Sequence, residues 1–380
     1  MRGHINKTER KDGSVAWRVV TDVPPGPDGK RRQKTTTHRT KKEAETALNQ
    51  RIRALATGSF YDDTIVMSNY LSQWLAGRQN IRANTRRGYD QHIRGYLTPY
   101  LGRVRLIDLR ARHIEDMYQQ IRERGNLSST SIRRVHATLR VALNAAVRRN
   151  LIAVNPATQV ELEPATRPRV TVWSPAQVRT FLAANQGERL IAAYHLMAYR
   201  GLRRGETLGL RWQDVDLDRG VLQVVQQLVE IGPELTFGPP KTKTGTRTVS
   251  LDTATVAVLR AHRARQAAEQ LALGPLWTES GLVFTREDGT PVRPNHATTH
   301  FPLMITKAGL PKIRLHDLRH TSASLGLEAG ESMKEVSDRL GHSSIVITAD
   351  TYSHIAPELA QKSAERLANL VAGPASENPR

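Results

Sequence analysis

Cysteine is absent from the 380 residues, and long apolar runs are absent as well. Without thiols the chain forms no disulfide, uses no thiol nucleophile and binds no zinc through cysteine. No stretch approaches the length of apolar sequence that a membrane-spanning helix needs, and the first residues lack the apolar segment of a secretory signal. We therefore expect a cytoplasmic protein that contacts no membrane.

Acidic side chains are scarce: 36 Asp and Glu face 56 Lys and Arg, which gives a formal net charge of +20. Such an excess indicates a polyanionic partner, nucleic acid first of all. A generically basic protein, such as one associated with ribosomes, is the alternative. Residues 65–160 hold 16 basic against 5 acidic side chains, whereas residues 165–380 hold 26 against 21. The first 160 residues are therefore expected to be the main DNA-binding region.

Residues 1–60 are predicted to form a β-hairpin followed by a helix. SVAWRVV alternates like a strand, PPGPDGK is typical of a turn, and RRQKTTT resumes an extended run. KKEAETALNQRIRALATG predicts a helix that ends near Gly58. Basic strands of this kind can lie in a DNA major groove. The alternative is a basic, partly disordered tail.

Residues 65–160 are predicted to form a helical domain of four segments. The clearest is TSIRRVHATLRVALNAAVRRN, in which apolar residues such as Ile132, Val135 and Leu139 recur at three- and four-residue steps. Its other face is rich in arginine and poor in acidic residues, which favours phosphate contact over a merely solvated surface. A proline-containing linker that runs to about residue 173 follows this domain.

A third domain, over residues 170–380, is predicted to mix helices with small sheets. Ser174 and Gln177 form a capping box, which predicts a helix that runs to Tyr199. A strand pair is expected around 221–226 and 247–251, with further helices to about residue 371. The whole chain is thus predicted to be a multidomain protein, mainly α with small β-sheets.

Opening a phosphodiester without a metal ion requires a nucleophile, cations for the non-bridging oxygens, a base and an acid for the leaving oxygen. Arginine suits phosphate because its planar fork donates to two oxygens at once. Arg203 follows a helix stop at Gly201, and Arg319 lies three residues after His316, so a helix would place both on one face. A salt bridge from Arg203 to Glu206 is the compatible alternative, and His316 is equally well read as a structural histidine.

Lysine is missing from residue 43 to residue 240, although arginine is plentiful there. The gap ends at PPKTKTGTR, which places Lys241 and Lys243 in an expected turn between strands. Lysine can give up its proton near neutral pH when its pKa is lowered, whereas arginine cannot. These lysines therefore fit either a general acid for the leaving oxygen or a solvated hairpin that touches the DNA backbone.

His342 and Tyr352 come near the carboxyl end. Ser332 and Glu335 predict a capped helix that Gly341 ends, so His342 is held firmly just past the stop and can donate to a phosphate oxygen. As single residues, a structural histidine and a half-buried packing tyrosine are the ordinary alternatives. The spacings of His316, His320, His342 and His354 match no closed zinc pattern, so no metal site is expected.

Four short sequence segments resemble those of a known family. In order along the chain, they are GLRRGETLGLRW, PKTKTGTRTVSL, LHDLRHTSAS and LGHSSIVITADTYSH. Together they resemble the tyrosine recombinase family, specifically phage-type integrases, over about residues 170–365. The helical part resembles that family's core-binding domain, and residues 1–60 resemble its arm-binding domain. The resemblance implies a site-specific DNA recombinase that integrates or excises mobile DNA through a 3′-phosphotyrosine intermediate.

The resemblance also implies a role for each matching residue. The nucleophile would be Tyr352, the phosphate-clamping arginines Arg203 and Arg319, the general acid Lys243, the base-like histidine His316, the second histidine His342, and the supporting carboxylate Glu206. It implies no metal and no cofactor. The expected partners are double-stranded DNA attachment sites, three further copies of the chain in a homotetramer, an excisionase and a host DNA-bending protein. The alternatives are a non-catalytic DNA-binding regulator of the same fold and a type IB topoisomerase-like enzyme.

Overall fold

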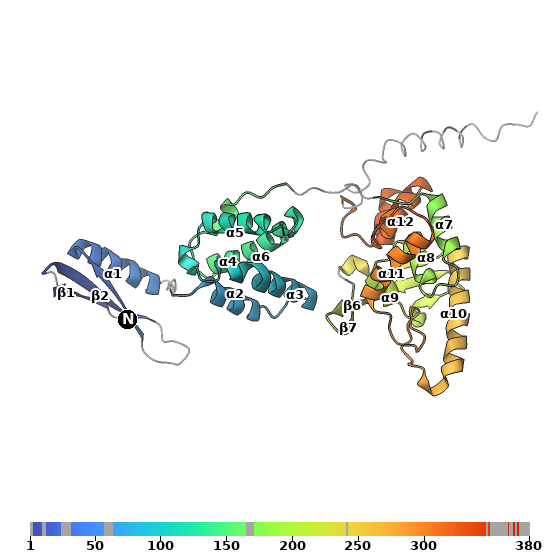
Figure 1. Ribbon diagram of the computed structural model, residues 1–380, viewed down its shortest axis with the longest axis horizontal. Coiled ribbons are helices and arrows are strands. Elements are labelled where there is room, and N and C mark those ends of the chain that lie inside the picture. Colours follow the sequence, from blue (N-terminus) through green and yellow to red (C-terminus); the bar gives the residue numbers. More distant parts are fainter. Residues whose placement is uncertain are drawn as a thin grey trace, which may run out of the picture. The chain divides into compact units, whose positions relative to one another are not determined.

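Figure 1 presents the computed structural model of the chain, which describes residues 3–9, 13–23, 32–56, 64–125, 127–164, 171–240 and 242–346, together with positions 349, 364, 368 and 371. The chain separates into two compact units, Met1–Arg167 and Pro168–Arg380. The finer division into three domains stays a prediction. Among the described residues, every helix is too short or too polar to cross a bilayer.

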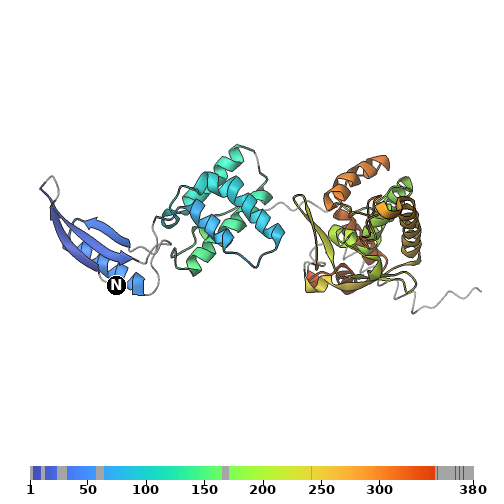
Figure 2. The ribbon, with the colours of Figure 1, turned by 90° about the horizontal axis from the view of Figure 1, so that it is seen from below.

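The first part is an antiparallel sheet covered by one helix (Figure 2). Its elements are β1 (Gly3–Glu9), β2 (Val15–Val23), β3 (Arg32–His38) and α1 (Lys41–Ala56). Ala16, Val19 and Ala44 are fully buried between the sheet and the helix. The sequence predicted only the β2–β3 hairpin and missed β1, because GHINKTE has a single large apolar residue and shows no alternation. The predicted turn PPGPDGK lies outside the described residues.

The second part is an all-helical bundle, as predicted. Its elements are α2 (Met67–Ala76), α3 (Ala83–His92), the π-helix η1 (Ile93–Leu97), α4 (Thr98–Leu101), η2 (Leu106–Asp108), α5 (Ala111–Glu123), α6 (Ser129–Arg148) and η3 (Pro156–Gln159). The apolar face predicted for α6 is buried, with Leu139 and Leu143 fully inaccessible. The short helix η3 was expected to be linker. It packs in the core, and the side chain of Asn155 caps it by accepting the backbone N–H of Ala157 at 2.9 Å.

The second compact unit combines seven α-helices with two small sheets in its described part. The helices are α7 (Pro175–Ala184), α8 (Ile191–Arg200), α9 (Arg204–Leu208), α10 (Thr253–Leu273), α11 (Pro294–Lys307), α12 (Asp317–Glu328) and α13 (Met333–Leu340). The strands are β4 (Val215–Asp216), β5 (Val221–Val224) and β8 (Arg247–Ser250) in one sheet, and β6 (Gln227–Ile231) and β7 (Glu234–Gly238) in a hairpin. Three short 3-10 helices complete it: η4 (Trp212–Asp214), η5 (Lys243–Gly245) and η6 (Gly274–Leu276).

The sequence predicted the start of the first helix in this unit correctly and its end incorrectly. The capping box of Ser174 and Gln177 is confirmed, with each side chain bonded to the other residue's backbone. The single helix predicted to run to Tyr199 is wrong, because the chain breaks between α7 and α8. The break is fixed by Asn185, whose buried amide donates to the carbonyl oxygens of Phe181 at 2.8 Å and Met304 at 3.2 Å.

Helix α12 is the central element that positions the site. It lies beside α8 (Figure 1) and is buried along most of its length, including polar residues. The hydroxyl of Thr321 accepts the backbone N–H of Trp173 at 3.1 Å, and the hydroxyl of Ser322 donates to the carbonyl oxygen of Tyr199 at 3.2 Å. Because buried polar groups stabilise a fold only when they are paired, these bonds fix α12 against its neighbours.

Candidate active site

Two helix ends meet at the site. Gly201 ends α8 with φ of 67° and Gly341 ends α13 with φ of 66°, a left-handed conformation that favours glycine. A Cβ atom at Gly201 would collide with the side chain of Leu340, so the two stops lie side by side. The sequence predicted both stops, and the fold brings together the residues that follow them.

Arg319 joins these two helix ends. Its side chain is almost fully buried, and it donates to the carbonyl oxygen of Gly201 and to that of Leu340, both at 2.6 Å. The last carbonyl groups of a helix have no partner within the helix and carry partial negative charge, so a guanidinium is favoured there. Arg319 is therefore part of the framework as well as a candidate phosphate ligand.

Arg203 also contacts one of these two helix ends, and Glu206 holds its side chain. The guanidinium donates to Glu206 Oε1 at 2.6 Å and to the carbonyl oxygen of Gly341 at 3.2 Å, and the Arg203 side chain is 30% exposed. Glu206 is buried and also pairs with Arg247, whose Nη2 lies 2.9 Å from Oε2. Burial alone would raise the pKa of Glu206, but the charges and hydrogen bonds of Arg247 and Arg203 lower it below its ordinary value.

The neighbouring arginine points elsewhere. Arg204 donates to the hydroxyl of Thr298 on α11, and it feels the charge of Glu230 on β6. Of these two arginines, Arg203 and not Arg204 donates to the carbonyl oxygen of Gly341, the residue that ends α13. The geometry therefore favours Arg203 over Arg204 as the residue that faces the candidate phosphate position.

The histidines of the site are held in their neutral form. The pKa of His342 is lowered to about 4, first by burial and then by the charges of Arg319 and Arg203. The pKa of His316 is also lowered to about 4, by desolvation and by the charges of His320, Arg319 and Arg203, although the residue as a whole is exposed. A neutral imidazole can accept one proton and donate another, which suits either half of a proton transfer.

The turn η5, which begins with Lys243, packs against Gly341 at the end of α13. Lys243 begins η5, and its side chain lies outside the described part of the structure. The backbone of η5 is described, and a Cβ atom at Gly341 would come within 2.9 Å of the carbonyl oxygen of Thr244. The fold thus brings the turn that begins with Lys243 next to the glycine that precedes His342. Tyr352 and His354 lie outside the described residues.

Sequence reasoning missed Arg247 and gave His320 no role in the reaction. Arg247 lies two residues before Val249 on β8, and Val249 is buried, so the strand alternation places both on the inward face. That alternation was the available signal. His320 follows Arg319, and its ring lies 5.4 Å from that of His316, centroid to centroid. Across the described ranges, no three His, Asp or Glu side chains are grouped as ligands for a metal ion.

Two profiles of known protein families match the sequence of this chain. The "phage integrase family" profile matches residues 172–358, and the profile of the "phage integrase, N-terminal SAM-like domain" matches residues 66–121. The fold and the profiles define a tyrosine-type DNA strand transferase. The chain belongs to the phage integrase family and is a site-specific recombinase.

Curated relatives resemble the chain over most of its length. A "tyrosine recombinase XerC-like" protein of Caldanaerobacter subterraneus subsp. tengcongensis is 28% identical over 95% of this chain and 97% of its own. The ICEBs1 integrase of Bacillus subtilis is 27% identical over 85% of this chain and 86% of its own. At 95% of the chain, the first of these alignments extends into the part that precedes both family profiles.

Solved structures share the fold. The Tn1549 transposon integrase in complex with transposon right-end DNA has a TM-score of 0.68 at 23% identity, over 80% of this chain and 100% of that one. The lambda integrase tetramer bound to a Holliday junction has a TM-score of 0.58 at 18% identity, over 91% of this chain and 94% of that one. These likenesses confirm the predicted fold class, mainly helical with small antiparallel sheets.

Proposed function

We propose that this recombinase integrates or excises mobile DNA by cleaving and rejoining its attachment sites through Tyr352. The observation that carries the proposal is the convergence of Arg203 and Arg319 on two adjoining helix stops, beside His316 and His342. Two fixed cations and two neutral imidazoles at one place are suited to a phosphodiester whose charge increases in the transition state.

In the proposed reaction the phenol oxygen of Tyr352 attacks phosphorus in line, and its proton passes to His316. The bond between phosphorus and the 5′ oxygen breaks, and Lys243 gives that oxygen a proton. The products are a 3′-phosphotyrosine and a free 5′-hydroxyl. Rejoining is the reverse reaction with the 5′-hydroxyl of the exchanged strand, so bond number is conserved and no cofactor is consumed.

The remaining residues support this chemistry in the proposal. Arg203 and Arg319 neutralise the non-bridging oxygens, and His342 donates a hydrogen bond to one of them. Glu206 holds the Arg203 fork in place through the bond at 2.6 Å. The lambda integrase tetramer on a Holliday junction supports a homotetramer on two duplexes as the working assembly. An excisionase, a host DNA-bending protein and a cytoplasmic location also remain part of the proposal.

Replacing Tyr352 by phenylalanine tests the nucleophile. The substrate is a nicked duplex carrying the chain's own attachment site, which traps the covalent intermediate because the cleaved fragment diffuses away. We expect no covalent adduct from Tyr352→Phe and nearly unchanged DNA binding, since only the attacking oxygen is removed. A persisting adduct would refute the assignment. Absence of adduct from the unaltered chain on this site would instead favour the non-catalytic regulator.

Replacing Lys243 by alanine tests the general acid. We expect cleavage of ordinary DNA to slow by about 10²–10⁴-fold, the usual contribution of a positioned acid. Cleavage of DNA with sulfur in place of the bridging 5′ oxygen should slow far less, because a thiolate leaves without a proton. Equal slowing on both substrates would remove the acid role from Lys243 and leave the nucleophile assignment untouched.

A further inference from the structure

Arg247 makes three directed contacts in the second compact unit. Its side chain is 7% exposed, and its three nitrogens donate to three different acceptors. Nε donates to the carbonyl oxygen of Arg339 at 2.6 Å, Nη1 to the carbonyl oxygen of Gly245 at 2.9 Å, and Nη2 to Glu206 Oε2 at 2.9 Å. Only a guanidinium presents donors in three fixed directions, so lysine is not equivalent at this position.

Each acceptor belongs to a different element of the site. Gly245 is the last residue of η5, the turn that begins with Lys243. Arg339 is in the last turn of α13, which ends one residue before Gly341. Glu206, on α9, holds the Arg203 fork. One side chain therefore connects the lysine turn, the helix end beside His342 and the support of the phosphate clamp.

Close packing leaves little freedom between these elements. A Cβ atom at Gly341 would lie 2.9 Å from the carbonyl oxygen of Thr244 and 3.0 Å from Nη1 of Arg247. The η5 backbone and the Arg247 side chain thus contact the helix stop directly. A displacement of Arg247 would remove its bonds to the carbonyl oxygens of Gly245 and Arg339, which join η5 to the end of α13.

We infer that Arg247 is a positioning residue for the leaving-group step: it fixes the η5 turn, and with it the backbone of Lys243, against the α13 stop that carries His342. The inference rests on the proposed function, since it requires Lys243 as the acid. A misplacement of about 1 Å in a catalytic group can cost roughly 10²-fold in rate, so a small shift of η5 is sufficient.

The test compares Arg247→Met and Arg247→Lys with the unaltered chain on two substrates. One is ordinary nicked attachment-site DNA, and the other has sulfur at the bridging 5′ position. We expect Arg247→Met to slow cleavage of ordinary DNA by roughly 10²-fold and to slow cleavage of the sulfur substrate by less than about a tenth of that factor. Arg247→Lys keeps a charge for Glu206 but cannot reach all three acceptors, so it should show the same selective loss. Arg247→Lys also provides the test if Arg247→Met does not fold.

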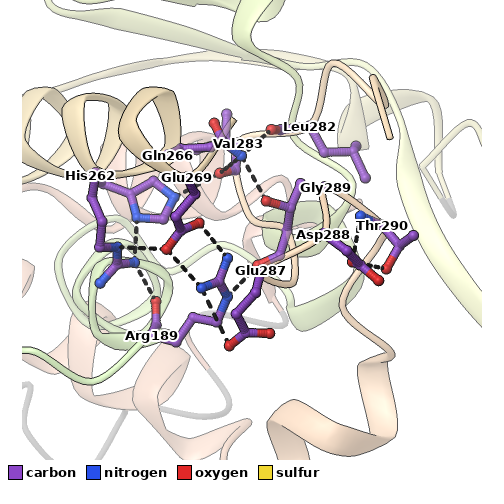
Figure 3. A network of polar contacts seen from close by, with 12 residues as sticks. Arg189, His262, Gln266, Glu269, Leu282, Val283, Glu287, Asp288, Gly289 and Thr290 are labelled. Carbon is purple, nitrogen blue, oxygen red and sulfur yellow. Dashed lines mark hydrogen bonds and ion pairs between the residues drawn. The ribbon is translucent and has the colours of Figure 1, made fainter. Parts of the chain in front are cut away.

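Arg189 supplies the matched control, because it is a partly buried arginine with an equally dense set of contacts away from the site (Figure 3). It donates to the carbonyl oxygen of Thr285 at 2.8 Å and to both oxygens of Glu269 at 2.9 and 2.7 Å. Its position just before α8 begins is at the opposite end of that helix from Gly201. Arg189→Met should lower stability while leaving the rate ratio of the two substrates unchanged.

The possible outcomes distinguish a wrong role for Arg247 from a wrong role for Lys243. Equal slowing on both substrates by the two Arg247 variants overturns the positioning role. Relief by an uncharged methylphosphonate at the scissile position, without relief by sulfur, also overturns it, because Arg247 would then act through Glu206 on Arg203. Loss of the sulfur effect in Lys243→Ala itself would mean that the proposed acid is wrong, whatever Arg247 does.

Discussion

Arg319 offers the most demanding test of the site, because the structure gives it a framework role and the proposed function gives it a chemical role as well. It is 3% exposed and donates to two helix-terminal carbonyl oxygens at 2.6 Å. A hydrogen bond from a charged donor contributes about 1.5–3 kcal/mol, so Arg319→Met should lower the free energy of unfolding by about 3–6 kcal/mol. Loss of a fixed donor at the reacting phosphate should slow cleavage by a further factor of about 10²–10³.

Two measurements separate these effects. Urea unfolding gives the stability change, and single-turnover formation of the covalent adduct at saturating DNA, under conditions where the variant is folded, gives the chemical change. DNA with an uncharged methylphosphonate at the scissile position needs less neutralisation, so Arg319→Met should lose much less activity on it. Arg204→Met is the control, since Arg204 faces Thr298 and should keep its rate on both substrates.

Two results would refute the reasoning on Arg319. A variant that folds with unchanged stability would mean that the guanidinium does not bridge Gly201 and Leu340. A variant that loses activity equally on ordinary and methylphosphonate DNA would mean that Arg319 holds the framework but does not neutralise the phosphate.

Two further predictions concern pH and the α13 stop. His195 and His262 are buried, and each has its pKa lowered from 6.5 to about 4, mainly by burial, so the unfolded chain binds more protons between these values. The free energy of unfolding, from urea titrations, should therefore fall as pH drops from 6.5 to 4, by at most roughly 3 kcal/mol for each histidine, and His262→Gln should flatten the fall; an unchanged profile in that variant would contradict the assignment. Gly341→Ala should cost about 1–2 kcal/mol for its left-handed backbone and should also slow adduct formation, because its Cβ meets Thr244 at 2.9 Å. Gly309→Ala has the same strain at φ of 64° with open space around it, so it should lose stability without losing rate, and equal rate loss in both would refute the contact.

Local sequence signals predicted much of the site's framework, because they act within a few residues. The Ser332–Glu335 capping box and the end of the helix at Gly341 are both confirmed. Asp252 likewise caps α10 locally, by accepting the backbone N–H of Thr255 at 2.9 Å. The same signals did not reveal the break after α7, since it depends on an Asn185 bond to a helix more than a hundred residues away.

Residue types and their order predicted which side chains take part in the proposed chemistry: arginines that stay charged, a lysine where lysine is otherwise missing, and a tyrosine in a motif near the end. Only the tertiary structure decided that Arg203 rather than Arg204 faces the helix stops, and that Arg247 connects β8 to α9, η5 and α13. The physical reason is that capping and periodicity are local, whereas a guanidinium's partners depend on which distant carbonyl oxygens the fold brings within about 3 Å of its nitrogens.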